Sequence, residues 1–200
     1  MKILAVSDQR LPQLNNAEFL RTHHHDVELL ISCGDMDPEY LDFIASVLSV
    51  PLYYVRGNHD QRYTEDTPGG INVHRRILSY DKITIAGLEG SIRYNKGSIQ
   101  YTEAEMTSHV LGLMPRFLMR RLFKGYGVDL LATHSPPRSI NDLTDWAHRG
   151  FRSFRWLIRW GRPRYLIHGH IDLIDQRTPR ETIYLRTRVI NINPSQVLTL

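Results

Sequence analysis

The sequence has little cysteine and no long hydrophobic run. Cys33 is the only cysteine among 200 residues, so an internal disulfide is excluded and a cytoplasmic location is expected. No run of about 18 apolar residues exists, which argues against a transmembrane helix. The apolar stretch Met1–Val6 is too short for a signal peptide. With 42% hydrophobic residues, the chain is expected to form one domain, residues 1–200, around a sizeable core.

Acidic residues are scarce beyond the first third of the chain. Residues 1–66 hold 11 acids and 5 bases, so the net charge of +4 leaves +10 on the remainder. This excess is mostly arginine, which suits a phosphorylated substrate and also nucleic acid. Residues 149–164 contain six arginines and no acid, interleaved with aromatic residues at helical spacing. Such spacing is typical of core packing with a solvated basic face. It leaves open a patch for a polyanion, a membrane surface or single-stranded nucleic acid.

Short apolar runs alternate with helical patterns in the first part of the sequence. We expect strands over residues 2–6, 27–32 and 51–55, with helices from Asn15 or Asn16 to about 24 and from Pro38 to about 48. Asp37 is expected to cap the second helix rather than to bind a metal. Short loops between such elements imply parallel strands joined by right-handed crossovers.

The second part of the sequence continues with strands and two further helices. A loop and a strand are expected within residues 61–82, and buried strands over 83–88, 128–132 and 165–167. Thr102 and Glu105 fit a capping box that opens a helix to about 124, in which Pro115 could introduce a break. Another helix is expected over about 150–160. Residues 171–200 should form three or four short β segments with no helix between them.

Side chains that can bind metal follow five of the apolar runs. They are Asp8; Asp35; Asn58 with His59; His134; and His168 with His170. Ligands of α/β sheets bind at the carboxyl ends of strands, so these side chains are expected to converge. Carboxylates and amides mixed with imidazoles suit Mn, Fe, Zn or a related divalent ion, and the ligands suffice for two ions. Two ions can share a hydroxide nucleophile and stabilise an in-line displacement at phosphorus.

At these residues the sequence resembles the calcineurin-like metallophosphoesterases. Their pattern is Asp-x-His, Gly-Asp, Gly-Asn-His-Asp/Glu, a lone His after a strand, and Gly-His-x-His. Over residues 1–170 this chain supplies Asp8, Gly34-Asp35, Gly57-Asn58-His59-Asp60, His134, and His168 with His170. Residues 87–101 and 148–156 are also similar to a bacterial branch of small phosphoesterases.

The resemblance implies a fold and an activity. The fold would be a four-layer α/β/β/α sandwich of two mixed β-sheets flanked by helices. The activity would be metal-dependent hydrolysis of a phosphomonoester or phosphodiester, as a phosphatase or a phosphodiesterase, by a metal-bound hydroxide. Asp35 would bridge two ions. The other implied ligands are Asp8 and His170 for the first ion, and Asn58, His134 and His168 for the second.

The resemblance also implies roles beside the metal ligands. His59 would face the phosphate and protonate the leaving oxygen or stabilise the transition state. Asp60 would orient His59 or support its loop. We further expect Arg93, Tyr94 and Asn95 to line the substrate pocket together with Asn58 and His59. The loop residues His74 and His148 could reach the mouth of that pocket.

Two positions depart from the family pattern. Arg10 stands where the family has a histidine, and a guanidinium cannot donate a lone pair to a metal. Water could complete the first ion, Gln9 or a nearby histidine could replace the ligand, or Arg10 could grip the substrate phosphate. A one-metal site and an inactive scaffold also stay open. In the last motif Ile167 precedes His168 where the family has glycine, but the His-x-His spacing predicts that ligation survives.

The most direct expectation is an enzyme acting on a small phosphorylated substrate, with Mn as the metal to test first. A nuclease acting on DNA or RNA and a catalytically inactive binding scaffold are the alternatives, and a homodimer is left open.

Overall fold

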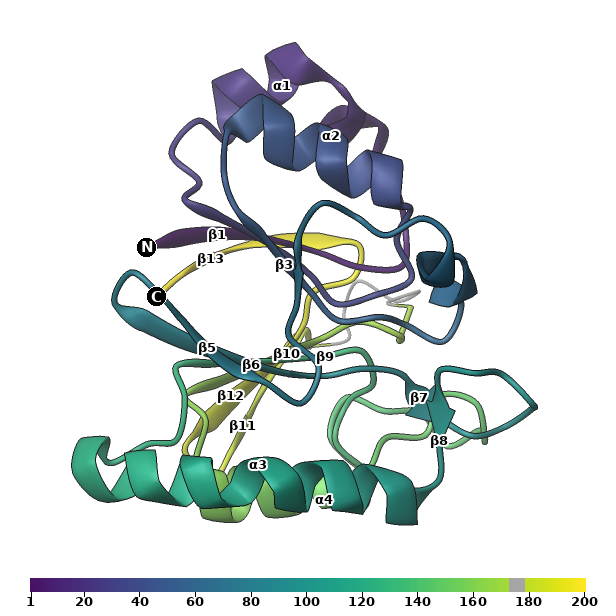
Figure 1. Ribbon diagram of the computed structural model, residues 1–200, viewed down its shortest axis with the longest axis vertical. Coiled ribbons are helices and arrows are strands. Elements are labelled where there is room, and N and C mark those ends of the chain that lie inside the picture. The colour runs from purple at the N-terminus through teal and green to yellow at the C-terminus, as the bar shows by residue number, and fades with distance from the viewer. Residues whose placement is uncertain (173–178) are drawn as a thin grey trace.

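The computed structural model of the chain describes residues 1–172 and 179–200. Two β-sheets pack face to face, and helices cover the outer face of each sheet (Figure 1). This is the four-layer α/β/β/α sandwich expected from the sequence, and the fold class is confirmed. Within the described ranges, no helix is long and apolar enough to cross a membrane.

The first sheet has five strands in the order β13-β1-β2-β3-β4. Strands β1 to β4 are parallel, and β13 pairs antiparallel with β1. Their bounds are Lys2–Val6 for β1, Leu29–Ser32 for β2, Leu52–Tyr54 for β3, Ile71–Asn72 for β4 and Ser195–Thr199 for β13. The parallel crossovers run through α1 (Ala17–His23) and α2 (Pro38–Leu48), which cover this sheet in Figure 1.

The second sheet has six strands in the order β11-β12-β10-β9-β6-β5. The four central strands are parallel, and the two edge strands are antiparallel to their neighbours. Their bounds are Ile77–Tyr80 for β5, Ile83–Leu88 for β6, Leu130–Thr133 for β9, Tyr165–His168 for β10, Glu181–Tyr184 for β11 and Thr187–Asn191 for β12. A separate pair, β7 (Ser91–Ile92) and β8 (Gln100–Tyr101), lies beyond the end of β6.

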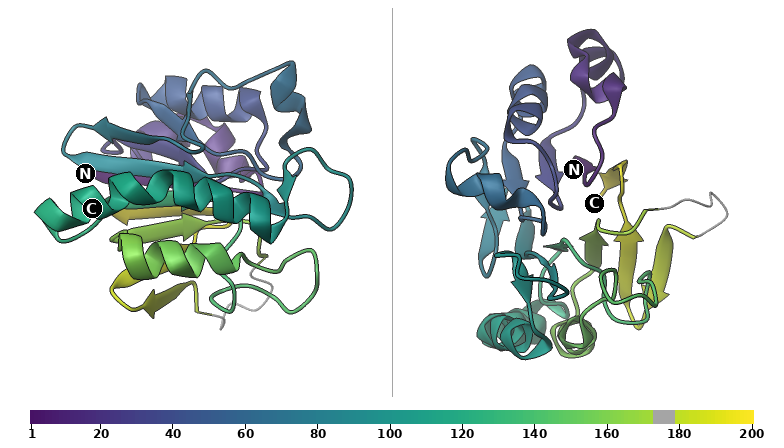
Figure 2. Two further views of the ribbon diagram at one scale, coloured as in Figure 1. Left: turned by 60° about the horizontal axis from the view of Figure 1, so that its bottom comes forward. Right: turned by 90° about the vertical axis from the view of Figure 1, so that its right-hand side faces the viewer.

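Two helical segments lie side by side on the outer face of the second sheet (Figure 2). One is α3 (Glu103–Lys124), and the other is α4 (Arg152–Trp156) continued by a π-helical turn, η3 (Leu157–Gly161). Two 3-10 turns, η1 (Pro12–Asn15) and η2 (Asp60–Thr64), complete the helical elements.

The helix starts follow the sequence signals. The Asn16 side chain accepts from the Phe19 amide, and the Asp37 carboxylate caps α2. Thr102 and Glu105 form the reciprocal capping box. Pro115 lies inside α3 without ending it. Its position on the exposed side lets water satisfy the carbonyl that loses its hydrogen bond.

The described part of the tail follows the expected pattern, whereas residues 61–82 contain two short strands where a loop and one strand were expected. Residues 61–82 contain β4 and β5, and the tail contributes β11, β12 and β13. The part of the predicted tail over residues 173–178 lies outside the described residues. The helix expected over about 150–160 is the short α4 followed by the π-helical turn.

The core fills the three interfaces between the four layers. Alternate residues of the strands point to opposite faces, so Ile3 and Ile31 pack between the two sheets while Leu4 and Leu30 pack under α1 and α2. Leu131 and Leu166 pack under α3 and α4. Cys33 lies in the layer between the sheets, where burial raises the pKa of its thiol. It is the small core residue that its apolar surroundings predicted.

Candidate metal centre

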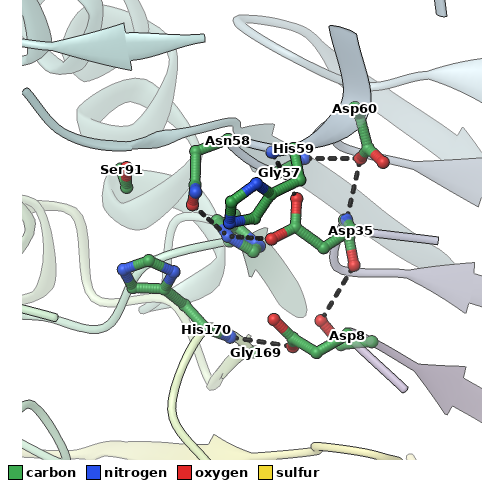
Figure 3. A network of polar contacts seen from close by, with 12 residues as sticks. Asp8, Asp35, Gly57, Asn58, His59, Asp60, Ser91, Gly169 and His170 are labelled. Atoms are coloured by element: carbon green, nitrogen blue, oxygen red, sulfur yellow. Dashed lines mark hydrogen bonds and ion pairs between the residues drawn. The ribbon is translucent and has the colours of Figure 1, made fainter. Parts of the chain in front are cut away.

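The loops that follow β1, β2, β3, β9 and β10 meet at one edge of the sandwich. Figure 3 shows the side chains of Asp8, Asp35, Asn58 and His170 gathered there. Each residue follows a strand of the parallel core, and parallel strands deliver their carboxyl ends to the same edge. The convergence expected from the sequence is therefore present for these residues.

Asp35, His134 and His170 form a group that could hold a metal ion. One ligand atom from each of the three lies within 4.8 Å of the others. The Nε2 atom of His134 lies 3.4 Å from Oδ2 of Asp35 and 2.9 Å from Oδ1 of Asn58. His134 and Asn58 are buried, and Asp35 is half-buried, so a ligand at this point would be largely shielded from water.

Backbone carbonyls determine which imidazole nitrogens face the ligand group. Nδ1 of His134 lies 2.8 Å from the Cys33 carbonyl oxygen, and Nε2 of His170 lies 2.9 Å from the Ala147 carbonyl oxygen. A carbonyl only accepts, so Nδ1 of His134 and Nε2 of His170 carry protons. The nitrogens that face the ligand group are Nδ1 of His170 and Nε2 of His134, and the latter lies 2.9 Å from Oδ1 of Asn58. Backbone carbonyls orient metal-binding histidines in this way in many metal sites.

The electrostatics favour a positive charge at the same point. Burial lowers the pKa of His134, but the negative charges of Asp35 and Asp8 outweigh burial and raise it overall. Asn58 turns its oxygen toward His134 because its Nδ2 donates to the Tyr94 hydroxyl at 3.2 Å. Either a proton on Nε2 of His134 or a metal cation would satisfy the oxygens of Asn58 and Asp35 that face it. The donor set therefore fits a divalent metal ion.

Close backbone packing brings the ligand loops together. A Cβ atom on Gly57 would lie 2.0 Å from Oδ1 of Asp35, and one on Gly169 would lie 1.9 Å from Oγ of Ser7 and 2.3 Å from Oδ2 of Asp8. Only glycine fits either position. The ligand-bearing residues themselves adopt left-handed backbone conformations, with φ of 65° at Asp8, 55° at Asp35 and 65° at His170.

Asp60 ties two of these loops to each other. Its Oδ2 accepts from the amide of Asp35 at 2.8 Å and from the amide of Gly57 at 2.7 Å. Burial raises the pKa of Asp60 to about 6. Two roles were expected for Asp60, and these hydrogen bonds agree with support of the loop.

An ion pair between the half-buried Arg56 and the buried Glu89 also holds this loop. Arg56 donates to both carboxylate oxygens of Glu89, from Nε at 2.8 Å and from Nη2 at 2.7 Å, and the Tyr101 hydroxyl donates to Glu89 at 2.7 Å. The Arg56 carbonyl accepts from the Gly90 amide at 2.9 Å. Arg56 lies two residues before Asn58 in the chain, so these contacts fix the start of the loop that carries Asn58. No pattern in the sequence pointed to Glu89, which follows β6 as an ordinary loop residue.

Comparison with known proteins assigns the family. The family model of the calcineurin-like phosphoesterase superfamily domain matches residues 1–171. The chain belongs to this superfamily. A search of curated protein sequences gave no match.

Two solved structures illustrate the likeness of fold. TT1561 of Thermus thermophilus superposes with a TM-score of 0.61 at 14% sequence identity, over 96% of this chain and 88% of that chain. GAP50, the anchor in the inner membrane complex of Plasmodium, superposes with a TM-score of 0.52 at 13% identity, over 96% of this chain and 70% of that chain. At these identities the comparison shows the shared fold.

His168 is not brought into the ligand group. It is the last residue of β10, and strand alternation places it on the same face as Leu166, which packs under α3. Its Nδ1 lies 2.9 Å from the Gly169 carbonyl oxygen, and its Nε2 lies 3.5 Å from Nδ2 of Asn141. His170, the first residue after Gly169, occupies the position beside His134, with their ring centroids 4.7 Å apart.

This placement changes how the last superfamily motif fits the chain. Gly169 is the residue that must be glycine, so Gly169-His170-Ile171-Asp172 matches the pattern Gly-His-x-His with aspartate at its end. Asp172 lines the same pocket as Asp8 and Asp35, and its Oδ1 accepts from Gln9 at 2.9 Å. Asp172 was not among the residues predicted from the sequence. Matching the motif on its glycine rather than on the His-x-His spacing would have found it.

Arg10 is not brought to the ligands either. Its guanidinium forms an ion pair with Asp37 at the start of α2, and its side chain is 61% exposed. Gln9 instead turns into the pocket. Three outcomes were expected for position 10. Replacement of the missing ligand by another side chain agrees with the structure, because Gln9 lines the pocket. A contact of Arg10 with the substrate phosphate has no support in this geometry.

The mouth of the pocket is formed by some of the predicted substrate residues. His59, Tyr94 and His148 line it, and the His59 amide donates to Oδ1 of Asp35 at 2.8 Å. Arg93 points elsewhere and pairs with Glu105 at 2.9 Å. The Asn95 side chain accepts from the Gly97 amide within its own turn. His74, also named as a loop candidate, packs instead against Tyr101 and the amide of Glu89.

Proposed function

We propose that the protein is a divalent-metal-dependent phosphoesterase that hydrolyses a small phosphomonoester or phosphodiester. One observation supports this most directly: imidazole nitrogens of His134 and His170 converge with oxygens of Asp35 and Asn58 in a chain of the calcineurin-like superfamily. The group lies in a pocket at the carboxyl ends of the strands, which is open to a ligand through His59 and Tyr94.

The proposed ligands form two sets that share Asp35. Asn58, His134 and His170 would hold one ion. Asp8 and Asp172 would hold the other, so the Asp172 carboxylate replaces the imidazole that ends the last motif of the superfamily pattern. A site rich in carboxylate oxygen suits Mn, which remains the first metal to test, ahead of Fe and Zn. When bound, the ions would lower the pKa of a coordinated water and neutralise charge on the phosphoryl group.

We assign His59 to the substrate rather than to the metal. Its ring is exposed at the pocket mouth, while its amide holds Asp35 in place. From there the imidazolium would bind the phosphoryl oxygens and donate its proton to the leaving oxygen. The Tyr94 hydroxyl keeps the Asn58 oxygen turned toward the ligands and borders the space for substrate. Asp60 holds the Asp35 and Gly57 loops in register.

The test combines metal content with turnover. Wild-type protein loaded with Mn is expected to bind two ions and to hydrolyse p-nitrophenyl phosphate or bis-p-nitrophenyl phosphate in a chelator-sensitive way. His59→Ala should keep its metal and lose roughly 100-fold in turnover. His134→Ala and Asp172→Ala should each bind one ion less by elemental analysis. Two ions retained in Asp172→Ala would refute its assignment, and loss of metal in His59→Ala would make His59 a ligand.

A binding scaffold is the second candidate. The observation that favours it is the ion pair of Arg10 with Asp37, which removes position 10 from metal binding. If the Mn-loaded protein binds one ion or none and hydrolyses neither substrate, the scaffold replaces the enzyme as the proposed function. A cytoplasmic location, a homodimer and a single domain over residues 1–200 stay predictions.

A further inference from the structure

Beyond the first turn of α3, which contains Glu103 and Glu105, the helical layer over the second sheet carries basic residues and no acid. From Met106 to Lys124, which covers α3 beyond its first turn, the chain has four basic residues and no acid. Residues 149–164, which include α4 and η3, have six arginines and no acid. The layer over the first sheet is mixed by contrast, because α1 and α2 contain Glu18, Glu39 and Asp42 beside Arg21. The excess of basic residues in the later part of the sequence is thus concentrated on one face of the molecule.

Four arginines at the end of this layer surround an exposed tryptophan. Arg121, Arg159, Arg162 and Arg186 line a hollow with Trp160 and Leu185. No carboxylate pairs with any of the four within residues 1–172 and 179–200. The charge of Arg121, then partial desolvation and the charge of Arg186, lower the pKa of Arg162. Repulsion among these side chains would be relieved by an anionic ligand.

A second hollow continues the same surface along α4. It is lined by Arg152, Arg155 and Trp156, and it shares Arg159 and Trp160 with the first hollow. The shared residues make the two hollows one continuous surface. None of its residues lines the pocket of the candidate metal centre.

Apolar side chains protrude beside these arginines. On α3, Leu111, Leu118 and Leu122 follow one another at spacings of seven and four, which places them on one stripe. Leu122 is 78% exposed, and Trp156 and Trp160 are each about half exposed. At the edge strand β11 and its turn, Ile183 and Leu185 are also exposed. Arg121 joins the two helical segments by donating to the Trp160 carbonyl at 2.6 Å.

We propose that this surface, the α3–α4 face, docks on a membrane that carries anionic lipids. The arginines would contact lipid phosphates, and the leucines and tryptophans would enter the headgroup region. Helices that lie in a membrane interface combine basic residues with tryptophan and leucine in this way. Figure 2 shows α3 and α4 side by side at the outer side of the sheet, so one surface could contact both.

A membrane explains the face better than a nucleic acid does. Arginine and tryptophan suit either partner, because tryptophan also stacks on bases. Of these two partners, only lipid offers an apolar environment to the exposed leucines of α3 and the aliphatic residues of the β11 turn. The proposal does not depend on the proposed enzymatic activity, since it concerns a different surface.

Vesicle binding tests the proposal with the whole chain and without metal. The probes are vesicles of phosphatidylcholine alone and vesicles that also contain phosphatidylglycerol, used in a flotation assay over a series of salt concentrations. The protein is expected to bind only the anionic vesicles, and salt should weaken binding. Failure to bind them at low salt would overturn the proposal.

Variants connect binding to the α3–α4 face. Each arginine near an anionic surface contributes roughly fivefold to binding, so the triple variant Arg159→Gln, Arg162→Gln, Arg186→Gln should lose about 100-fold. A control with the same loss of charge, Arg21→Gln, Arg76→Gln, Lys82→Gln, alters exposed bases that line neither hollow and should bind within about fivefold of wild type. Equal binding by the two triple variants would refute the docking face.

The leucine stripe separates the membrane from a nucleic acid. Leu118→Ser with Leu122→Ser changes exposed side chains and should weaken vesicle binding about tenfold or more without altering its salt dependence. A labelled single-stranded oligonucleotide serves as the competing probe. If it binds with the same sensitivity to the arginine triple variant, and the leucine variant binds vesicles like wild type, the face belongs to nucleic acid and the membrane proposal fails.

Discussion

Acid is expected to weaken the fold through His74. This histidine lies between β4 and β5, and its Nδ1 accepts from the Glu89 amide at 3.1 Å. Its ring packs against Tyr101 and His109, with centroids 6.0 and 5.1 Å away. Burial lowers the pKa of His74 to about 4, and the nearby Glu89 carboxylate only partly opposes this effect. Protonation would also place a hydrogen on the atom that accepts from Glu89.

The magnitude follows from linkage. The unfolded chain takes up a proton at His74 near pH 6.5, whereas the folded chain takes it up near pH 4. The contribution of neutral His74 to the free energy of unfolding is therefore fully present above pH 6.5 and is lost as the pH falls toward 4. A tenfold difference in proton affinity between the two states corresponds to about 1.4 kcal/mol, so the loss in the free energy of unfolding approaches about 3 kcal/mol.

Urea unfolding between pH 7 and pH 4.5 measures this loss. His74→Asn keeps an acceptor for the Glu89 amide but cannot titrate, so its free energy of unfolding should fall less steeply in this range. His25→Asn, at an exposed histidine, is the matched control and should follow the wild type. If His74→Asn shows the same dependence on pH as the wild type, the reasoning from burial is wrong.

Three other substitutions test the loops around the ligands. Gly57→Ala would place a Cβ 2.0 Å from Oδ1 of Asp35, so Mn binding measured by calorimetry should weaken at least tenfold, with Gly112→Ala, where a Cβ meets open space, as control. Asp60→Ala leaves the amides of Asp35 and Gly57 without their acceptor and should lower the free energy of unfolding by about 2–4 kcal/mol in urea. Glu89→Gln removes the charge that Arg56 faces and should cost about 3 kcal/mol, and an unchanged urea midpoint would refute that role.

The sequence predicted the layers and most of the ligand group because both depend on local pattern. Apolar runs bounded by glycine or polar residues located β1, β2 and β3, and parallel topology then required their ends to meet. Asp8, Asp35, Asn58 and His134 follow directly from this rule. The caps at Asn16, Asp37 and Thr102 are equally local, since each depends on residues two or three positions along the chain.

The remaining site residues depend on features that spacing does not express. The His168 side chain is directed by strand alternation, so a His-x-His pattern does not by itself tell which imidazole faces the ligands. Asp172 could be matched to the last motif only from the close packing around Gly169, which shows that Gly169 is the glycine of that motif. The direction of Arg10 was decided by a carboxylate at the start of α2, which is distant in sequence and near in space.

The left-handed backbone of Asp8, Asp35 and His170 has a consequence for any selection applied to this protein. Side chains other than glycine lose roughly 1 kcal/mol in that conformation, and Asp8 in addition keeps a carboxyl whose pKa burial raises. Glycine would relieve the strain at all three positions and, at Asp8, the desolvation of the carboxyl as well. A library screened for heat resistance alone is therefore expected to discard the candidate ligands early, whereas a screen that also requires metal would retain them at a lower melting temperature.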